Sequence, residues 1–334
     1  MDYRVLGSTG LEVSQIGFGC GNVGGLMVRG EPEERVQAVA RAMELGVNYF
    51  DTAPAYGNGV SERNLGQALK ALSAEVYVGT KIRLEPQDLA DLKGALVCSV
   101  EESLTRLDRE YVDLIQVHNQ ITSQRDTGRA FLGADDLLGE VVDTFRSLKD
   151  QGKVRNYGIT GLGDTEALHR VIDSGELDTV QACYNLINPS AGQQVPSGFD
   201  LQDFGRLIDR AEAANTGIIV IRVLAAGALS GAETRHPVAV PSVAPIGSGR
   251  DYGEDLDRAT KFGFLVEEGH VEGTVEAAIR FALAKKGVST VLVGYSSLEH
   301  LEEAVGYAAK GPLPGEIVGR LPEVWSRFAG QEPA

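Results

Sequence analysis

GVNYFDTAPAYGNGVSER, residues 46–63, is the stretch from which the fold and the chemistry of this chain can be worked out. A short apolar run ends in Asp51, and a loop rich in glycine and proline then carries Tyr56 before a helical pattern opens at Ser61. The stretch predicts a strand, a loop and a helix capped by Ser61. An acid at a strand end and a phenol a few residues later indicate half of a site that transfers protons.

Alternating apolar runs and helical patterns recur on both sides of this stretch. Near-continuous apolar runs predict strands of a parallel sheet that is covered by helices, and eight of them predict a closed (β/α)8 barrel in a single domain, residues 1–334. The expected strands are 16–19, 47–51, 76–81, 112–118, 154–160, 179–184, 218–223 and 290–293. The expected helices are 33–45, 61–69, 91–107, 138–151, 165–174, 201–215, 271–286 and 298–309.

Three further segments accompany the repeating units. Residues 3–6 and 11–13, joined through GSTG, predict an N-terminal β-hairpin that closes one end of the fold. Residues 224–269 lie between the seventh strand and its helix, and a connection of that length predicts a functional lid. Residues 119–136 form a second insertion after the fourth strand.

A competing architecture is a Rossmann fold, because residues 19–24 read GCGNVG and match the dinucleotide-binding GxGxxG pattern. In that motif the last glycine packs within the first turn of a helix. Here residues 25–31 and Pro32 come before any helical period begins. We therefore interpret the segment as a glycine-rich loop that turns tightly or approaches a ligand.

Composition narrows the classes of partner. The chain has 334 residues and a formal net charge of −16, which disfavours nucleic acid and anionic membrane surfaces. No run approaches the ~18 apolar residues of a membrane span, and no signal peptide is apparent, so a cytoplasmic location is expected. Cys20, Cys98 and Cys183 form no CxxC pair, so reduced thiols are expected rather than disulfides or a metal site.

Four polar residues fall at the ends of successive expected strands: Asp51, Tyr56 in the loop behind it, Lys81 and His118. In an eight-stranded barrel these ends open on one face, and neighbouring strands lie ~4.8 Å apart. We therefore expect one compact cluster. Each residue alone is unremarkable as a turn, cap or surface residue, but an acid, a phenol, an ammonium and an imidazole together indicate proton transfer at an oxygen atom.

Lys81 is expected to lower the pKa of Tyr56. A phenol has an unperturbed pKa near 10, and an ammonium ~4 Å away is worth about 4 kcal/mol at an effective dielectric constant of 20. That energy is enough to bring the pKa of Tyr56 toward neutrality. Asp51 is expected to hold Lys81 charged, and His118 to donate a hydrogen bond to a carbonyl oxygen. No group in the cluster can carry electrons, so a separate redox partner is required.

Several blocks of sequence resemble aldo-keto reductases: RVLGSTGLEVSQIGFG, FDTAPAYGNGVSERNLGQAL, GTK, DLIQVH, QACYNLINP and LAAGALSG. Together they extend over nearly the whole chain in the family's order. The resemblance implies a (β/α)8 barrel and hydride transfer between NADP(H), or alternatively NAD(H), and the carbonyl carbon of an aldehyde, ketone or aldose. It also implies Tyr56 as general acid/base, with Asp51 and Lys81 as its partners and His118 orienting the substrate oxygen.

The resemblance also implies a set of cofactor-contacting residues. They are Gly19, Asp51, Thr160, Gln181, Arg222, Leu224, Gly227, Leu229, Ser230, Gly294, Ser296, His300 and Glu303.

Three departures from the family pattern concern the cofactor. Thr160-Gly161 stands where the family has Ser-Asn, and Ile221-Arg222 where it often has a stacking aromatic residue. No Lys or Arg lies in 287–309, where a 2′-phosphate is commonly bound, so Arg250 or Lys261 of the long loop is the expected substitute.

The remaining histidines and the single tryptophan carry weaker expectations. We interpret His169, His236 and His270 as surface or loop residues. Trp325 either packs against the barrel or forms a wall of the substrate pocket.

An alternative function from another class is a regulatory barrel that binds cofactor but acts through a protein partner, as the potassium-channel β subunits of this family do. The intact group of four polar residues favours the enzyme, with a small carbonyl or sugar substrate.

Overall fold

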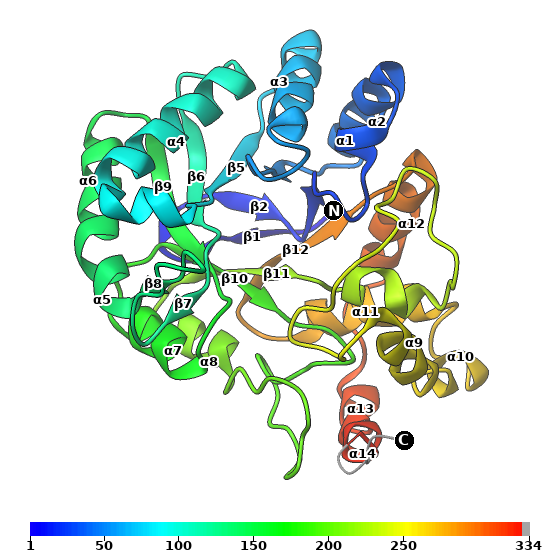
Figure 1. The fold of residues 1–334 in the computed structure, drawn as a ribbon. Coiled ribbons are helices and arrows are strands. Elements are labelled where there is room, and N and C mark those ends of the chain that lie inside the picture. Colours follow the sequence, from blue (N-terminus) through cyan, green and yellow to red (C-terminus); the bar gives the residue numbers. More distant parts are fainter. Residues whose placement is uncertain (329–334) are drawn as a thin grey trace.

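A closed barrel of eight parallel strands forms the centre of the computed structural model, which describes residues 1–328 (Figure 1). Hydrogen bonds join the strands in the order β10, β11, β12, β3, β4, β5, β6, β9 and back to β10. The strands are β3 (Ile16–Gly19), β4 (Tyr49–Asp51), β5 (Tyr77–Ile82), β6 (Val112–Val117), β9 (Val154–Thr160), β10 (Thr179–Cys183), β11 (Gly217–Ile221) and β12 (Val288–Gly294). The predicted (β/α)8 fold is confirmed.

Helices surround the barrel and form its outer layer (Figure 1). Those that follow the barrel strands are α2 (Pro32–Glu44), α3 (Val60–Leu72), α4 (Leu92–Leu107), α6 (Val142–Asp150), α7 (Thr165–Asp173), α8 (Leu207–Ala213), α11 (Thr274–Ala284) and α12 (Leu298–Ala309). Further helices are α1 (Leu26–Arg29), α5 (Ala134–Asp136), α9 (Tyr252–Thr260), α10 (Phe264–Glu267), α13 (Gly315–Val318) and α14 (Leu321–Ser326). Within residues 1–328, none of them combines the length and apolar character that crossing a membrane requires.

Most predicted elements agree with the observed ones to within a few residues, but two differ. The helix expected at 201–215 is shorter, because Gly205 and Arg206 take left-handed backbone angles and α8 begins only at Leu207. The segment 224–269, expected as one long connection, contains α9, α10 and a 3₁₀ turn, η4 (Ala225–Ser230).

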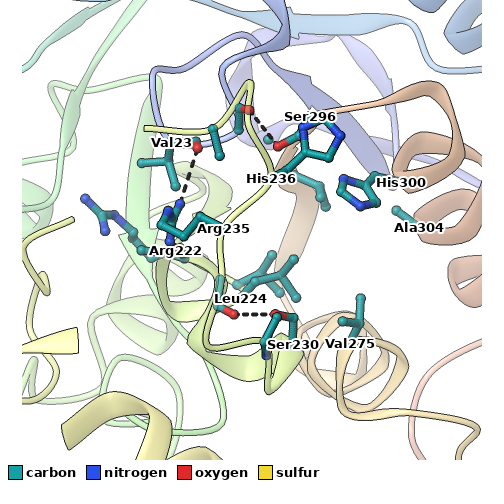
Figure 2. Close-up of a pocket in the computed structure, with 18 of the residues that line it drawn as sticks. Val23, Arg222, Leu224, Ser230, Arg235, His236, Val275, Ser296, His300 and Ala304 are labelled. Carbon is teal, nitrogen blue, oxygen red and sulfur yellow. Dashed lines mark hydrogen bonds between the residues drawn. The ribbon is translucent and has the colours of Figure 1, made fainter. Parts of the chain in front are cut away.

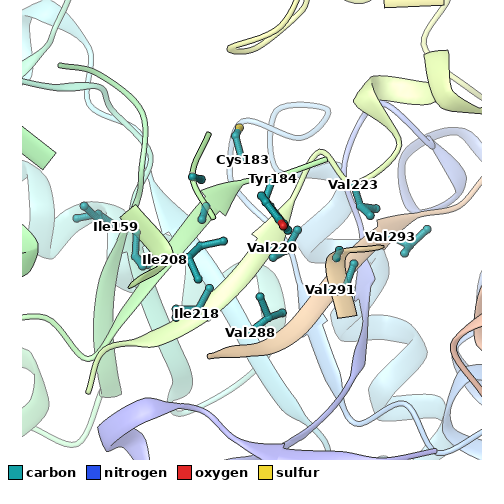
Figure 3. Packing of buried hydrophobic residues seen from close by; sticks show 14 of the residues in the cluster. Ile159, Cys183, Tyr184, Ile208, Ile218, Val220, Val223, Val288, Val291 and Val293 are labelled. Carbon is teal, nitrogen blue, oxygen red and sulfur yellow. The ribbon is translucent and has the colours of Figure 1, made fainter. Parts of the chain in front are cut away.

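Alternate side chains of the strands serve two apolar clusters. On β11, Ile218 and Val220 belong to the large cluster between the strands and the outer helices (Figure 3), whereas Ile219 points to the other face. Ile219 packs with Leu114 and Leu292 in a small cluster that fills the barrel interior. A packed interior leaves the two ends of the barrel as the places where ligands can bind.

The N-terminal hairpin of β1 (Tyr3–Val5) and β2 (Glu12–Ser14) closes the end of the barrel where the strands begin. Leu6, Leu11 and Val13 of this hairpin join the interior cluster. Gly7 has φ +52, and a Cβ there would lie 2.1 Å from the backbone nitrogen of Gly217. The hairpin therefore sits against the start of β11, as expected, and leaves the opposite end open.

The insertion after β6 is a small structured unit. Within 119–136, β7 (Ile121–Thr122) and β8 (Leu132–Gly133) form a two-stranded parallel sheet. The buried side chain of Asn119 supports it, with Nδ2 donating 2.8 Å hydrogen bonds to the carbonyl oxygens of Leu84 and Ala130. This unit lies beside the mouth of the barrel.

Two helical glycines offer a matched test of the packing between the outer helices. A Cβ on Gly66 of α3 would lie 2.4 Å from the carbonyl oxygen of Leu107, whereas nothing lies within 4 Å of a Cβ on Gly306 of α12. We expect Gly66→Ala to destabilise the fold by about 1–3 kcal/mol through overpacking. Gly306→Ala is expected to stabilise it by up to ~1 kcal/mol, because alanine favours helix. Urea unfolding measures both, and stabilisation by both variants would contradict the close approach of α3 and α4.

Candidate active site

Three side chains from successive strand ends meet at the open end of the barrel. Asp51 ends β4, Lys81 lies near the end of β5, and His118 follows β6. The Lys81 ammonium forms an ion pair with the Asp51 carboxylate and donates a 2.8 Å hydrogen bond to the carbonyl oxygen of Thr52. Both members of the pair are buried, with exposed side-chain fractions of 1% for Lys81 and 5% for Asp51.

Tyr56 joins this group from the loop after β4. The Lys81 nitrogen lies 5.0 Å from the centroid of the Tyr56 ring, and the rings of Tyr56 and His118 meet edge to face at 6.0 Å between centroids. The structure therefore brings together all four residues that the sequence predicted as one cluster.

The loop that carries Tyr56 is fixed at both ends. Gly57 and Gly59 take positive φ angles of 62° and 79°, which glycine adopts without strain. The prediction that Ser61 caps α3 is wrong, because Gly59 is the N-cap residue. Instead the Ser61 hydroxyl donates a 2.8 Å hydrogen bond to the carbonyl oxygen of Cys20 and contacts the Thr52 hydroxyl at 2.8 Å. Ser61 thus ties the loop to the ends of β3 and β4.

The second carboxylate oxygen of Asp51 is also occupied. Gln181 of β10 donates a 2.8 Å hydrogen bond to Asp51 Oδ2, and the Tyr49 hydroxyl donates a 3.3 Å bond to the same atom. Gln181 in turn accepts a 3.4 Å hydrogen bond from the Thr160 hydroxyl. Asp51 is therefore oriented from β10 as well as β5, which is what a buried charge needs to remain ionised.

The expectation that Lys81 brings the pKa of Tyr56 toward neutrality is wrong for the structure as it stands. Burial raises the pKa of the Tyr56 phenol above its ordinary value, and the positive charge of Lys81 only partly opposes this effect. Asp51 lies beside Lys81 and offsets much of its field, as Coulomb's law requires. Burial acts against the charged form of Lys81 too, but Asp51 and Tyr56 outweigh it and raise the Lys81 pKa. Tyr56 is therefore a protonated phenol beside a permanent cation.

His118 is held neutral. Burial, together with the positive charges of Lys81 and Arg83, lowers the pKa of His118 to about 3. Its Nδ1 atom is buried and has no hydrogen-bond partner among the described residues. A neutral imidazole carries one N–H donor and one acceptor, so His118 has hydrogen-bonding capacity left for a ligand.

A cavity of about 650 Å³ adjoins this group (Figure 2). Its walls come from the loop after β3, the turn after β11, the long loop before α9, the end of β12 and the start of α12. A Cβ on Gly21 would lie 3.6 Å from the Tyr56 ring, and Val23 and Gly24, two and three residues further on, line the cavity. One end of the cavity is therefore next to Tyr56.

Most of the residues that the resemblance assigned to the cofactor face this cavity. Those in its lining are Arg222, Leu224, Gly227, Ser230, Gly294, Ser296, His300 and Glu303. Gly19, Asp51, Thr160 and Gln181 lie outside the lining, at the strand ends around the Asp51 carboxylate. Leu229 is fully buried and packs into the core, so it is a support of the turn and not a lining residue.

Arg235 and His236 line the cavity from the long loop (Figure 2), and the sequence does not predict either of them as a site residue. Each of the three guanidinium nitrogens of Arg235 donates to a backbone carbonyl oxygen, of Val240 at 2.6 Å, Ala226 at 2.8 Å and Val23 at 3.3 Å. Arg235 therefore fastens the long loop across the cavity. Sequence spacing could not have placed it, because nothing in a loop's composition fixes where its side chains point.

The two basic residues expected to replace a missing phosphate contact do not reach the cavity. Arg250 is exposed and pairs with Glu254 at 3.3 Å, and Lys261 is likewise absent from the lining. His236 is a loop residue, as expected, but its ring lies 5.8 Å from that of His300 at the cavity wall.

Trp325 packs against the barrel. It is buried, and its indole N–H donates a 2.8 Å hydrogen bond to the carbonyl oxygen of Leu186. Of the two positions expected for Trp325, packing against the barrel is the one observed.

Comparison with known proteins agrees with this geometry. The model of the aldo/keto reductase family matches residues 15–326. L-galactose dehydrogenase of Arabidopsis thaliana is 31% identical over 314 residues, covering 91% of this chain and 87% of the relative. D-threo-aldose 1-dehydrogenase of a Pseudomonas species is 27% identical over 349 residues, covering 95% of each.

A solved structure shows the same fold. The holo form of an aldo-keto reductase from Bacillus halodurans superposes with a TM-score of 0.70 at 24% identity, covering 100% of this chain and 98% of the other. The family model spans nearly all of the chain, and the fold agrees with that of this solved aldo-keto reductase. The chain therefore belongs to the aldo/keto reductase family of oxidoreductases.

Proposed function

We propose that this chain is an NAD(H)-dependent oxidoreductase that interconverts, by hydride transfer, an aldehyde and the corresponding alcohol, or the hemiacetal of an aldose and the corresponding lactone. The observation that carries the proposal is the buried Lys81–Asp51 ion pair with the Tyr56 phenol beside it, at the end of a cavity of about 650 Å³. Pockets for cofactors and other small ligands range over ~300–1,000 Å³. The two dehydrogenase relatives act, by their names, on L-galactose and on D-threo-aldoses, which supports a sugar substrate.

Tyr56 is the proposed proton donor in reduction. As a carbonyl carbon accepts a hydride, its oxygen gains negative charge, and the phenol gives up its proton to that oxygen. The raised pKa keeps the donor protonated at rest, and the Lys81 ammonium stabilises the phenolate that proton transfer leaves behind. In the reverse direction the phenolate is the base that removes the hydroxyl proton.

His118 is proposed to orient the substrate oxygen. Because burial and neighbouring cations keep its imidazole neutral, His118 can offer an N–H to an oxygen without competing as an acid. Two donors, Tyr56 and His118, then converge on one oxygen and fix which face of the carbonyl is presented.

The cavity fits a nicotinamide dinucleotide, which when bound supplies or accepts the hydride. Backbone amides of the turn from Leu224 to Ser230 would hold the pyrophosphate, because small residues there let the main chain approach an anion. Ser296, His300 and Ala304 would surround the adenosine end. The nicotinamide end is the one beside Tyr56, where the hydride is needed.

Charge at the adenosine end favours NAD(H) over NADP(H). Glu303 lines this end, and a carboxylate accepts hydrogen bonds from ribose hydroxyls but repels a 2′-phosphate. Of the two arginines in the cavity lining, Arg222 points away from this end and Arg235 already donates to three carbonyl oxygens. A 2′-phosphate would therefore meet a carboxylate without the free Lys or Arg that commonly binds it.

The role of Tyr56 predicts a selective loss of chemistry. Tyr56→Phe is expected to lower kcat by about 10²–10⁴-fold, because it removes the proton donor and keeps the ring. The Kd of NADH, measured by nicotinamide fluorescence, is expected to stay within about twofold of wild type. A variant that keeps most of its turnover would show that another group transfers the proton.

The neutral state of His118 predicts a dependence of stability on pH. The unfolded chain takes up a proton near an imidazole pKa of ~6.5, whereas folded His118 does so only at about 3. Between these values the unfolded state binds more protons, so the contribution of His118 to the free energy of unfolding falls as the pH drops below ~6.5. His118→Gln is expected to show a shallower loss of stability from pH 7 to 4.5 in urea titrations, and parallel curves would contradict it.

The role of Glu303 predicts a change in nucleotide preference. Glu303→Lys removes a repulsive charge and adds an ammonium, so the Kd of NADPH is expected to fall at least about fivefold relative to that of NADH. Glu316→Lys on α13 makes the same change of charge at an exposed position outside the cavity lining and is the matched control. An equal effect from both variants would mean that net charge, and not contact, sets the preference.

A further inference from the structure

Arg222 occupies the end of the cavity that faces the proposed reaction site. It directly follows β11 and lines the cavity, and Figure 2 shows it pointing away from the end where Ser296 and His300 lie. Its backbone takes a left-handed conformation, φ 58°, which is uncommon for a residue with a side chain. Asn185 holds this turn by donating a 2.9 Å hydrogen bond to the Arg222 carbonyl oxygen.

The guanidinium of Arg222 is a half-buried charge with hydrogen-bonding capacity to spare. In the part of the chain that the structure describes it forms no ion pair, and its one side-chain hydrogen bond is a long one, 3.4 Å from Nη1 to the carbonyl oxygen of Ala244. Asp255 acts on it only from a distance, since that carboxylate accepts 2.7 Å hydrogen bonds from the Ser248 hydroxyl and the Gly249 amide. Burial without a partner lowers the pKa of Arg222.

The other cations around the site are already engaged. Lys81 is paired with Asp51, Arg83 lies 3.8 Å from Glu85, and Arg235 donates to three carbonyl oxygens. Arg222 and Tyr56 are near enough to interact electrostatically: the charge of Arg222 opposes the effect of burial on the phenol's pKa. Among the described residues, Arg222 is therefore the cavity-lining cation that has neither an ion pair nor a short hydrogen bond.

We propose that Arg222 binds an anionic substituent, a carboxylate or phosphate, of the carbonyl substrate. The carbonyl oxygen of the same substrate contacts Tyr56 and His118. The inference rests on the proposed function of this site and deepens it by naming a substrate class. A guanidinium binds either anion through paired N–H donors, and the pairing is strongest where water is partly excluded. A chain with a net charge of −16 repels anionic substrates in general, so it needs a local cation to bind one.

The test compares two aldehydes of equal chain length, butanal and 4-oxobutanoate, with NADH as the co-substrate. The wild-type enzyme is expected to show a KM for the anionic aldehyde at least tenfold lower than for the neutral one. In Arg222→Gln the ratio of the two KM values is expected to fall toward one, and Arg222→Lys is expected to restore part of it. Arg250→Gln removes an exposed guanidinium outside the cavity lining and is expected to keep the wild-type ratio.

The following results would overturn this inference or the proposed function on which it rests. Equal KM values in the wild-type enzyme, or a ratio that survives Arg222→Gln, would show that Arg222 does not bind the substrate. A tenfold rise in the Kd of NADH in Arg222→Gln with an unchanged KM ratio would assign the guanidinium to the dinucleotide. A wild-type chain that neither binds NADH nor reduces either aldehyde would overturn the proposed function itself.

Discussion

A buried ammonium and a buried carboxylate, Lys81 and Asp51, neutralise each other at the centre of this site. Each would be costly alone, because moving one charge out of water into a protein interior costs several kcal/mol. Together, with Gln181 and Tyr49 donating to the carboxylate, they form a rigid polar group at the mouth of the barrel. Tyr56 can act as a proton donor because it lies against that group.

The barrel makes this pairing unavoidable. Asp51 and Gly79 are partners in the register of β4 and β5, so Lys81, two residues further on, lies on the same side of the sheet as Gly79 and just beyond it. Packing of the interior by Leu114, Ile219 and Leu292 prevents the pair from sinking deeper. The site is thus held by backbone pairing on one side and by side-chain packing on the other, and the loops add the cavity.

Sequence reasoning could predict those parts of the site that regular structure positions. Asp51, Lys81 and His118 stand at strand ends, and strand ends in a parallel barrel share one face, so their convergence followed from spacing alone. Arg235 and His236 could not be placed in this way, because their loop has no periodic pattern and its path depends on contacts with Val23 and Ala226. The direction of the Tyr56 pKa was also missed, since the degree of burial cannot be read from sequence.

The most direct test of the central claim is a double-mutant cycle on the free energy of unfolding with Asp51→Asn, Lys81→Met and the two changes combined. If the buried pair organises the site, Asp51→Asn leaves the Lys81 ammonium unpaired and Lys81→Met leaves the Asp51 carboxylate unpaired. Each single change is then expected to destabilise the fold by about 3–5 kcal/mol. The double variant is then expected to lose clearly less than the sum of the two. Additivity within ~0.5 kcal/mol would show that the two residues act independently and would contradict the account.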